Sequence, residues 1–272
     1  IGILAGSFHS DFSKMIVTEI TKRLQKRGAE IHLYLGMDAS RYLEDYFDED
    51  DDTMSLQYFS LFSYSNFDEP DVLIISSDTI YAAEYGIELE NFLKKLPHIP
   101  KVIIGETVDN PSEIGIMVDQ YGGIRDMVDH LIEVHGCRRI AFLTGPHNIP
   151  NALCRLSAYK ASLKEHGIEY DEKLIRYGNF TSLCDKQAEE LLLQKPEAIA
   201  VANDEMTVAI YRAAKKLGLR IGKDVLVTGY DDIPVAETME PPLTTMRQNY
   251  DEVADMAVEK AYDFLEKGEA TS

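Results

Sequence analysis

The chain has 272 residues, of which 45% are hydrophobic and 27% charged, a balance typical of a globular protein with one large domain or two medium ones. With 47 acidic against 27 basic residues, its net charge is −20, which repels nucleic-acid phosphates and anionic lipid headgroups. The sequence shows no apolar run near the ~18 residues that span a bilayer and no signal peptide, so we expect a cytoplasmic protein without a membrane partner.

Short apolar runs alternate with amphipathic stretches along the chain. Runs rich in Ile and Val predict strands buried on both faces at residues 1–5, 31–35, 72–76, 102–104, 139–143, 198–202 and 225–229. Apolar residues at i, i+3 and i+4 predict helices at residues 12–26, 124–134 and 206–217, and a last helix over 251–267. Repeated strand–helix–strand units predict an α/β fold of two doubly wound parallel-sheet lobes joined by crossover hinge strands.

The two series of units predict the lobe boundaries. We expect an N-terminal lobe of residues 1–107 plus 247–272 and a C-terminal lobe of residues 108–246. The segment 106–123, with Pro111 and several glycines, would carry one crossover. Because ligands of doubly wound sheets bind at the carboxyl ends of the strands, we expect a site in the cleft between the lobes.

Metal and cofactor sites are not expected. Cys137, Cys154 and Cys184 are widely spaced and form no CxxC pair, which favours unpaired thiols in a reducing compartment over a disulfide framework or a zinc site. The acidic run at residues 48–52 lacks the glycine turn and the alternating ligands of an EF-hand loop. We interpret it as a solvated loop and predict no cofactor.

Several sequence blocks occur in a characteristic order through the second half of the chain. They read VDQYGG (118–123), RRIAFLTGP (138–146), RLSAY (155–159), VANDEM (201–206), LGLRIGKDV (217–225), TGYDDIP (228–234) and PPLTTMRQ (241–248). In this order and spacing the set resembles the effector-binding domain of LacI-type regulators, which is similar in fold to periplasmic sugar-binding proteins. The first hundred residues match by pattern only.

The resemblance implies ligand-binding roles for residues of the second lobe. Arg155 matches an arginine that reaches into the cleft, where its fork of donors suits vicinal hydroxyls or a carboxylate. Asn203 and Asp231 end successive strands and would bond ligand hydroxyls. Phe180 and Tyr250 lie where an aromatic ring can pack on a sugar or a base.

Each polar assignment has a structural alternative. Arg155 could be a surface helix residue. Of the neighbours Asp231 and Asp232, one could be the turn residue, and we assign the ligand contact to Asp231. Either Asn203 or Asp204 could cap the following helix, and we assign capping to Asp204 and ligand binding to Asn203.

Candidates in the first lobe follow its strands. The loop after the first strand holds Phe8, Ser10 and Asp11, where relatives place polar and aromatic ligand contacts, although Ser10 or Asp11 could instead cap a helix. Ser77 follows the third strand and is similarly placed.

No catalytic motif is present: the sequence has no G-x-S-x-G elbow, H-E-x-x-H, Walker loop or G-x-G-x-x-G. We therefore expect a non-enzymatic sensor that binds a small polar effector, sugar-like or nucleoside-like, and forms a homodimer. DNA would be bound only through an N-terminal domain not present in this sequence. The alternatives are a sensor with a diguanylate-cyclase or kinase output and a solute-binding protein of a transporter.

Overall fold

The computed structural model describes residues 1–6, 11–36, 69–80, 96–147 and 149–267. It divides into two compact units, which are described separately. Unit 1 comprises Ile1–Val118 and Asn249–Ser272, and unit 2 comprises Asp119–Gln248. Across the described ranges, no helix combines the length and the apolar character needed to cross a membrane.

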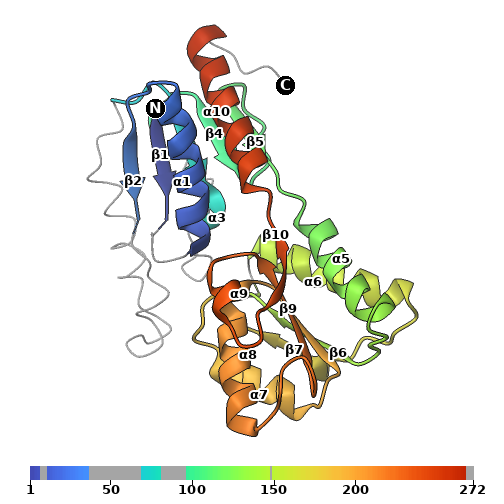
Figure 1. Cartoon of the computed structure of the whole chain (residues 1–272). Helices are drawn as coiled ribbons and strands as arrows, with labels where there is room; N and C mark the ends of the chain where they lie inside the picture. The colour runs from blue at the N-terminus through green and yellow to red at the C-terminus, as the bar shows by residue number, and fades with distance from the viewer. Residues whose placement is uncertain (7–10, 37–68, 81–95, 148, 268–272) are drawn as a thin grey trace, which may run out of the picture. The chain divides into compact units, whose positions relative to one another are not determined.

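Unit 1 is built on a five-stranded sheet in the order β2-β1-β3-β4-β5, with all neighbours parallel. Its strands are β1 (Gly2–Ala5), β2 (His32–Leu35), β3 (Leu73–Ser76), β4 (Lys101–Ile104) and β5 (Glu113–Ile116). Its helices are α1 (Asp11–Lys26), the short α3 (Ser77–Ile80) and α10 (Tyr250–Lys267). Helices α1 and α10 run side by side, although they lie at opposite ends of the chain (Figure 1).

Unit 2 repeats this plan with a parallel sheet in the order β10-β9-β8-β6-β7. Its strands are β6 (Ile140–Thr144), β7 (Ile175–Tyr177), β8 (Ala198–Val201), β9 (Leu226–Asp231) and β10 (Thr244–Arg247). Its helices are α5 (Gln120–Glu133), α6 (Pro150–Glu165), α7 (Asp185–Leu193), α8 (Asp204–Leu217), the short α9 (Val235–Thr238) and the single 3₁₀ turn Glu172–Leu174.

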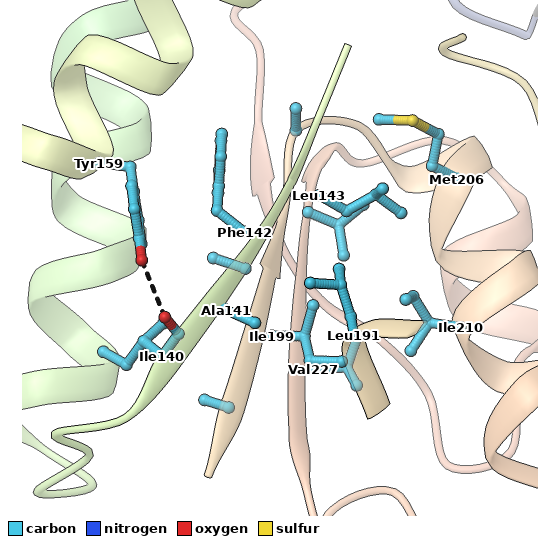
Figure 2. Close-up of a cluster of buried hydrophobic side chains, with 14 of the residues drawn as sticks. Ile140, Ala141, Phe142, Leu143, Tyr159, Leu191, Ile199, Met206, Ile210 and Val227 are labelled. Carbon is cyan, nitrogen blue, oxygen red and sulfur yellow. Dashed lines mark hydrogen bonds between the residues drawn. The ribbon is translucent and has the colours of Figure 1, made fainter. Parts of the chain in front are cut away.

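Helices pack in pairs on the unit 2 sheet, α5 with α6 and α7 with α8. Figure 2 shows Tyr159 of α6 on one side of the strands and Ile210 of α8 on the other. The Tyr159 hydroxyl donates a 2.8 Å hydrogen bond to the carbonyl oxygen of Ile140, and its ring stacks on Phe142 with centroids 4.9 Å apart (Figure 2). Burial on both faces explains why strands β6 and β8 are almost entirely apolar.

These two parallel sheets confirm the predicted α/β fold class. Each predicted strand overlaps an observed one, but β5, β7 and β10 were not predicted. Among the strands that the structure describes, these three lie at sheet edges and have a strand neighbour on one side only. Strand β10 shows the reason most clearly, because its residues are exposed or half-buried and form no apolar run.

The unit boundaries differ from the expected ones for the same reason. Strand β5 pairs with β4, which keeps the chain in unit 1 as far as Val118 rather than residue 107. Strand β10 pairs with β9 through Arg247, so the return to unit 1 comes after Gln248 rather than after residue 246.

Candidate functional site

A buried arginine marks the carboxyl ends of the central strands of unit 2. Arg155 lies on α6 and is only 6% exposed, so it is not the surface helix residue considered as an alternative. Its Nε donates to Oε1 of Gln120 at 2.8 Å, and Nη1 donates to the carbonyl oxygen of Ala202, which directly follows β8. These bonds engage two of its five N–H donors among the described residues, which leaves donors for a ligand oxygen.

Two aromatic rings flank this guanidinium. Its carbon lies 4.4 Å from the ring centroid of Tyr230 and 5.7 Å from that of Phe180, so both rings are within cation–π range. Burial raises the pKa of Tyr230 to about 12, with the Arg155 charge opposing the rise, and the phenol is therefore neutral at physiological pH. The sequence analysis included Phe180 but missed Tyr230, although the latter adjoins Asp231.

Strand alternation explains why Tyr230 was overlooked. Successive strand residues point to opposite faces, so Tyr230 and Asp231 would not be expected to approach the same side chain. Asp231 has φ = 120° and Asp232 has φ = 58°, which breaks the extended conformation at the end of β9. Tyr230 and Asp231 can then both face Arg155.

The two adjacent aspartates have different surroundings. Asp231 is 4% exposed, and its Oδ1 accepts a 2.6 Å hydrogen bond from Nε2 of Gln248 and lies 4.0 Å from Nη2 of Arg155. The Asp232 carboxylate instead pairs with Arg247, whose side chain is 78% exposed. The structure thus brings Asp231, not Asp232, to Arg155.

Asn203, rather than Asp204, caps helix α8, so the predicted assignment of the cap was wrong. The Asn203 backbone is extended (φ = −150°, ψ = 162°), and its side chain accepts a 3.2 Å bond from the Met206 N–H. Asp204 is already the first helical residue, whereas a capping side chain must come from the residue before it. The Asn203 Nδ2 donates to the carbonyl oxygen of Phe180 at 2.9 Å, and a ligand contact by Asn203 stays a prediction.

Asp204 has a different role that sequence reasoning missed. It is fully buried, and it accepts hydrogen bonds from the Thr245 hydroxyl at 2.6 Å and the Ile233 N–H at 3.0 Å. Burial raises its pKa to about 7, the nearby Asp231 adds to the rise, and the bond from Thr245 opposes it. A Cβ at Gly229 would lie 2.1 Å from Oδ1 of Asp204, so the carboxylate needs glycine there. Asp204 therefore ties α8 to β10 and to the turn after Asp231.

Phe180 is held in a specific place by two contacts. Its backbone adopts a left-handed conformation with φ = 61°, and its carbonyl oxygen accepts the Asn203 bond. A Cβ at Gly145 would lie 2.2 Å from the ring, so the ring rests directly over that glycine at the end of β6. Here the glycine is required for close approach of the ring.

We call Arg155, Phe180, Asn203, Tyr230 and Asp231 the unit 2 cluster. It combines buried hydrogen-bond donors, a carboxylate and aromatic faces at the carboxyl ends of parallel strands, the usual position of ligands in such sheets. This chemistry suits a polar ring compound, because ring hydroxyls can bond to the charged groups while an apolar face packs on aromatic rings.

The candidates of the first lobe are in unit 1 and have other contacts. Asp11 begins α1 and pairs with Lys14 at 2.8 Å. The Ser77 hydroxyl is fully buried and donates to the carbonyl oxygen of Ile104 at 2.7 Å. Tyr250 begins α10, is 7% exposed, and packs edge-on against Phe12 with centroids 5.9 Å apart. Their ligand roles stay predictions, and Phe8 and Ser10 lie outside the described residues.

A second polar cluster in unit 1 is satisfied by its own ion pairs. Arg23 of α1 pairs with Glu19 at 2.7 Å and, on α10, with Asp251 at 2.9 Å and Asp255 at 2.5 Å. The surrounding hollow between the two helices holds about 340 Å³. Because every charge in this set has an opposite partner, we interpret it as a structural link between α1 and α10.

Comparisons with known proteins place this geometry in a family. Residues 128–272, more than half of the chain, match a family model described as periplasmic binding protein-like domain. The chain is 40% identical over 155 residues to the HTH-type transcriptional regulator CelR of Thermobifida fusca, covering 55% of this chain and 45% of the relative. It is 32% identical over 171 residues to the ribose operon repressor of Escherichia coli K12, covering 61% and 51%.

Solved structures agree over nearly the whole chain. The Escherichia coli repressor ascG has a TM-score of 0.72 at 22% identity, covering 99% of this chain and 92% of that one. A complex of the transcriptional regulator CelR with cellobiose has a TM-score of 0.72 at 26% identity, covering 97% and 77%. These comparisons confirm the resemblance to LacI-type regulators, and the relatives are named as regulators rather than enzymes. The chain spans about half the length of the curated relatives it matches.

Proposed function

Because this chain belongs to the periplasmic binding protein-like family, we propose that it is the effector-sensing domain of a LacI-type transcriptional regulator. The effector would be a small polar molecule, sugar-like or nucleoside-like, bound at the unit 2 cluster. The observation that carries the proposal is the buried Arg155 guanidinium between Tyr230 and Phe180 with Asp231 beside it. A buried charge needs hydrogen-bond acceptors in place of water, and an oxygen-rich ligand supplies further acceptors to the guanidinium.

The test is a thermal-shift screen with cellobiose, ribose, adenosine and cytidine. A ligand that binds the folded state stabilises it by about 2.7 kcal/mol at roughly 100 times its Kd, which raises the melting temperature. For an effective ligand, Arg155→Lys should weaken binding at least about tenfold, because lysine lacks the planar fork and its fit between rings.

The matched control is Arg212→Lys, since Arg212 lies on α8 and pairs with Asp185 at the surface. Circular dichroism of both variants before the titration establishes that each is folded. If Arg155→Lys and Arg212→Lys bind the effector as tightly as the unaltered chain, the unit 2 cluster is not the site.

We also infer that the protein acts as a homodimer, as expected from the sequence. One chain has a mass of 30.7 kDa, and light scattering after size-exclusion chromatography should give twice that mass. A single-chain mass at tens of micromolar protein would contradict this part of the proposal.

DNA binding would belong to a part of the whole protein outside these 272 residues. The net charge of −20 repels a phosphate backbone, and the matched regulators are about twice as long as the matched segment. Fluorescence anisotropy with a labelled duplex should detect no binding by this chain at physiological salt. The cleft site and the cytoplasmic location expected from the sequence stay predictions, as do the alternative output domains.

A further inference from the structure

Two exposed histidines face each other at the end of helix α5, within unit 2. His130 lies in the last turn of the helix, and His135 follows the C-cap residue Val134. Their Nε2 atoms are 3.2 Å apart, and their ring centroids are 4.9 Å apart with the rings nearly perpendicular. A ring that carries its proton on Nε2 donates a hydrogen bond to the other ring nitrogen in this arrangement.

The same separation fits two nitrogens on one metal ion. Zinc–nitrogen bonds measure about 2.0–2.1 Å, so two imidazole nitrogens at a near-tetrahedral angle lie about 3.3 Å apart. The observed Nε2–Nε2 distance of 3.2 Å is close to this value. Neutral imidazole is a preferred ligand of zinc, copper and nickel, whereas calcium and magnesium prefer oxygen.

The backbone holds His135 in this position. The Gly136 N–H donates to the carbonyl oxygen of Ile132, and the Cys137 N–H donates to that of Leu131, each at 3.0 Å. Gly136 takes the left-handed conformation that closes a helix end, with φ = 69°. Because the turn is already closed, binding an ion would order little more than the two side chains.

From this geometry we propose that His130 and His135 chelate a divalent transition-metal ion such as Zn²⁺ or Ni²⁺ through their Nε2 atoms. Among the described residues no group of three His, Cys, Asp or Glu side chains is arranged to hold an ion, so water fills the remaining positions. Both rings bind as neutral imidazoles. The ring that carries its proton on Nε2 takes the tautomer with the proton on Nδ1, exchanged through water, and the proton count does not change. The ion then links helix α5 to the segment that leads into β6.

Calorimetry with ZnCl₂ and the metal-free chain tests this proposal. We expect one bound equivalent, and His130→Ala and His135→Ala should each weaken binding at least about tenfold, since either variant loses the chelate. His98→Ala is the matched control, because His98 is also exposed but belongs to unit 1, and it should bind Zn²⁺ like the unaltered chain. Equal affinity in all four proteins, or no binding by the unaltered chain, overturns the proposal.

Nuclear magnetic resonance gives a second measurement that needs no variant for its result. Substoichiometric Ni²⁺ should broaden the ring signals of His130 and His135 before those of the other histidines, because the paramagnetic ion acts at short range. The two single variants serve only to assign the signals. Earlier broadening of any other histidine overturns the assignment.

Discussion

The buried carboxyl of Asp204 gives the stability of unit 2 an unusual dependence on pH. Its pKa in the folded chain is about 7, whereas the ordinary value is 3.8. Between these values the folded chain holds a proton that the unfolded chain has released, so the stabilising contribution is full below pH 3.8 and is lost as the pH rises through 7. From pH 5 to pH 8 the loss amounts to about 2.5 kcal/mol.

Asp204→Asn isolates this contribution. The amide oxygen can accept the Ile233 N–H, and the amide nitrogen can donate to the Thr245 hydroxyl, so Ile233 and Thr245 both stay bonded to residue 204. The variant has no carboxyl to desolvate. Its unfolding free energy should therefore fall by about 2.5 kcal/mol less than that of the unaltered chain between pH 5 and pH 8.

The assay is urea unfolding followed by far-ultraviolet circular dichroism at pH 5, 6, 7 and 8. Other groups also respond to pH, including His166 and the overall negative charge, but they are common to both proteins and cancel in the difference. If the unfolding free energies of the two proteins change equally with pH across this range, the reasoning is refuted, because Asp204 then does not titrate there.

Two further predictions concern other contacts in unit 2. Gly145→Ala would place a Cβ 2.2 Å from the Phe180 ring, so we expect a loss of about 1–3 kcal/mol in urea unfolding; unchanged stability would contradict the observed contact. The pKa of His166 is raised above 6.5 by its bonds to the Ser162 carbonyl oxygen and to Glu133. Its stabilising contribution is present below pH 6.5 and lost above it, so the melting temperature of His166→Gln should fall less from pH 5.5 to pH 8; an equal fall would contradict this role.

The central strands and the main amphipathic helices could be predicted because burial on both faces, or on one face, leaves a direct pattern in the sequence. Edge strands leave little pattern, as β10 shows with its exposed and half-buried residues. The unit boundaries depend on the pairing of β5 with β4 and of β10 with β9. Because the sequence did not reveal β5 and β10, it could not give the exact boundaries either.

The sequence likewise identified some residues of the candidate site and missed the roles of others. The family resemblance implied ligand roles for Arg155, Phe180 and Asp231, and the structure brings them together around one guanidinium. The capping role of Asn203 was missed, because Asn203 and Asp204 are both good capping residues and only the start of α8 distinguishes them.

The sequence by itself therefore determined the fold class, the family and the chemical types gathered at the ends of the unit 2 strands. These properties depend on local patterns and on residue identity along the chain. Only the tertiary structure decided that Tyr230 joins Asp231 beside Arg155, because left-handed φ angles at Asp231 and Asp232 break the strand alternation. It alone also decided that Asp204 is a buried carboxyl rather than a cap, since burial depends on contacts from β9 and β10, which come later in the sequence.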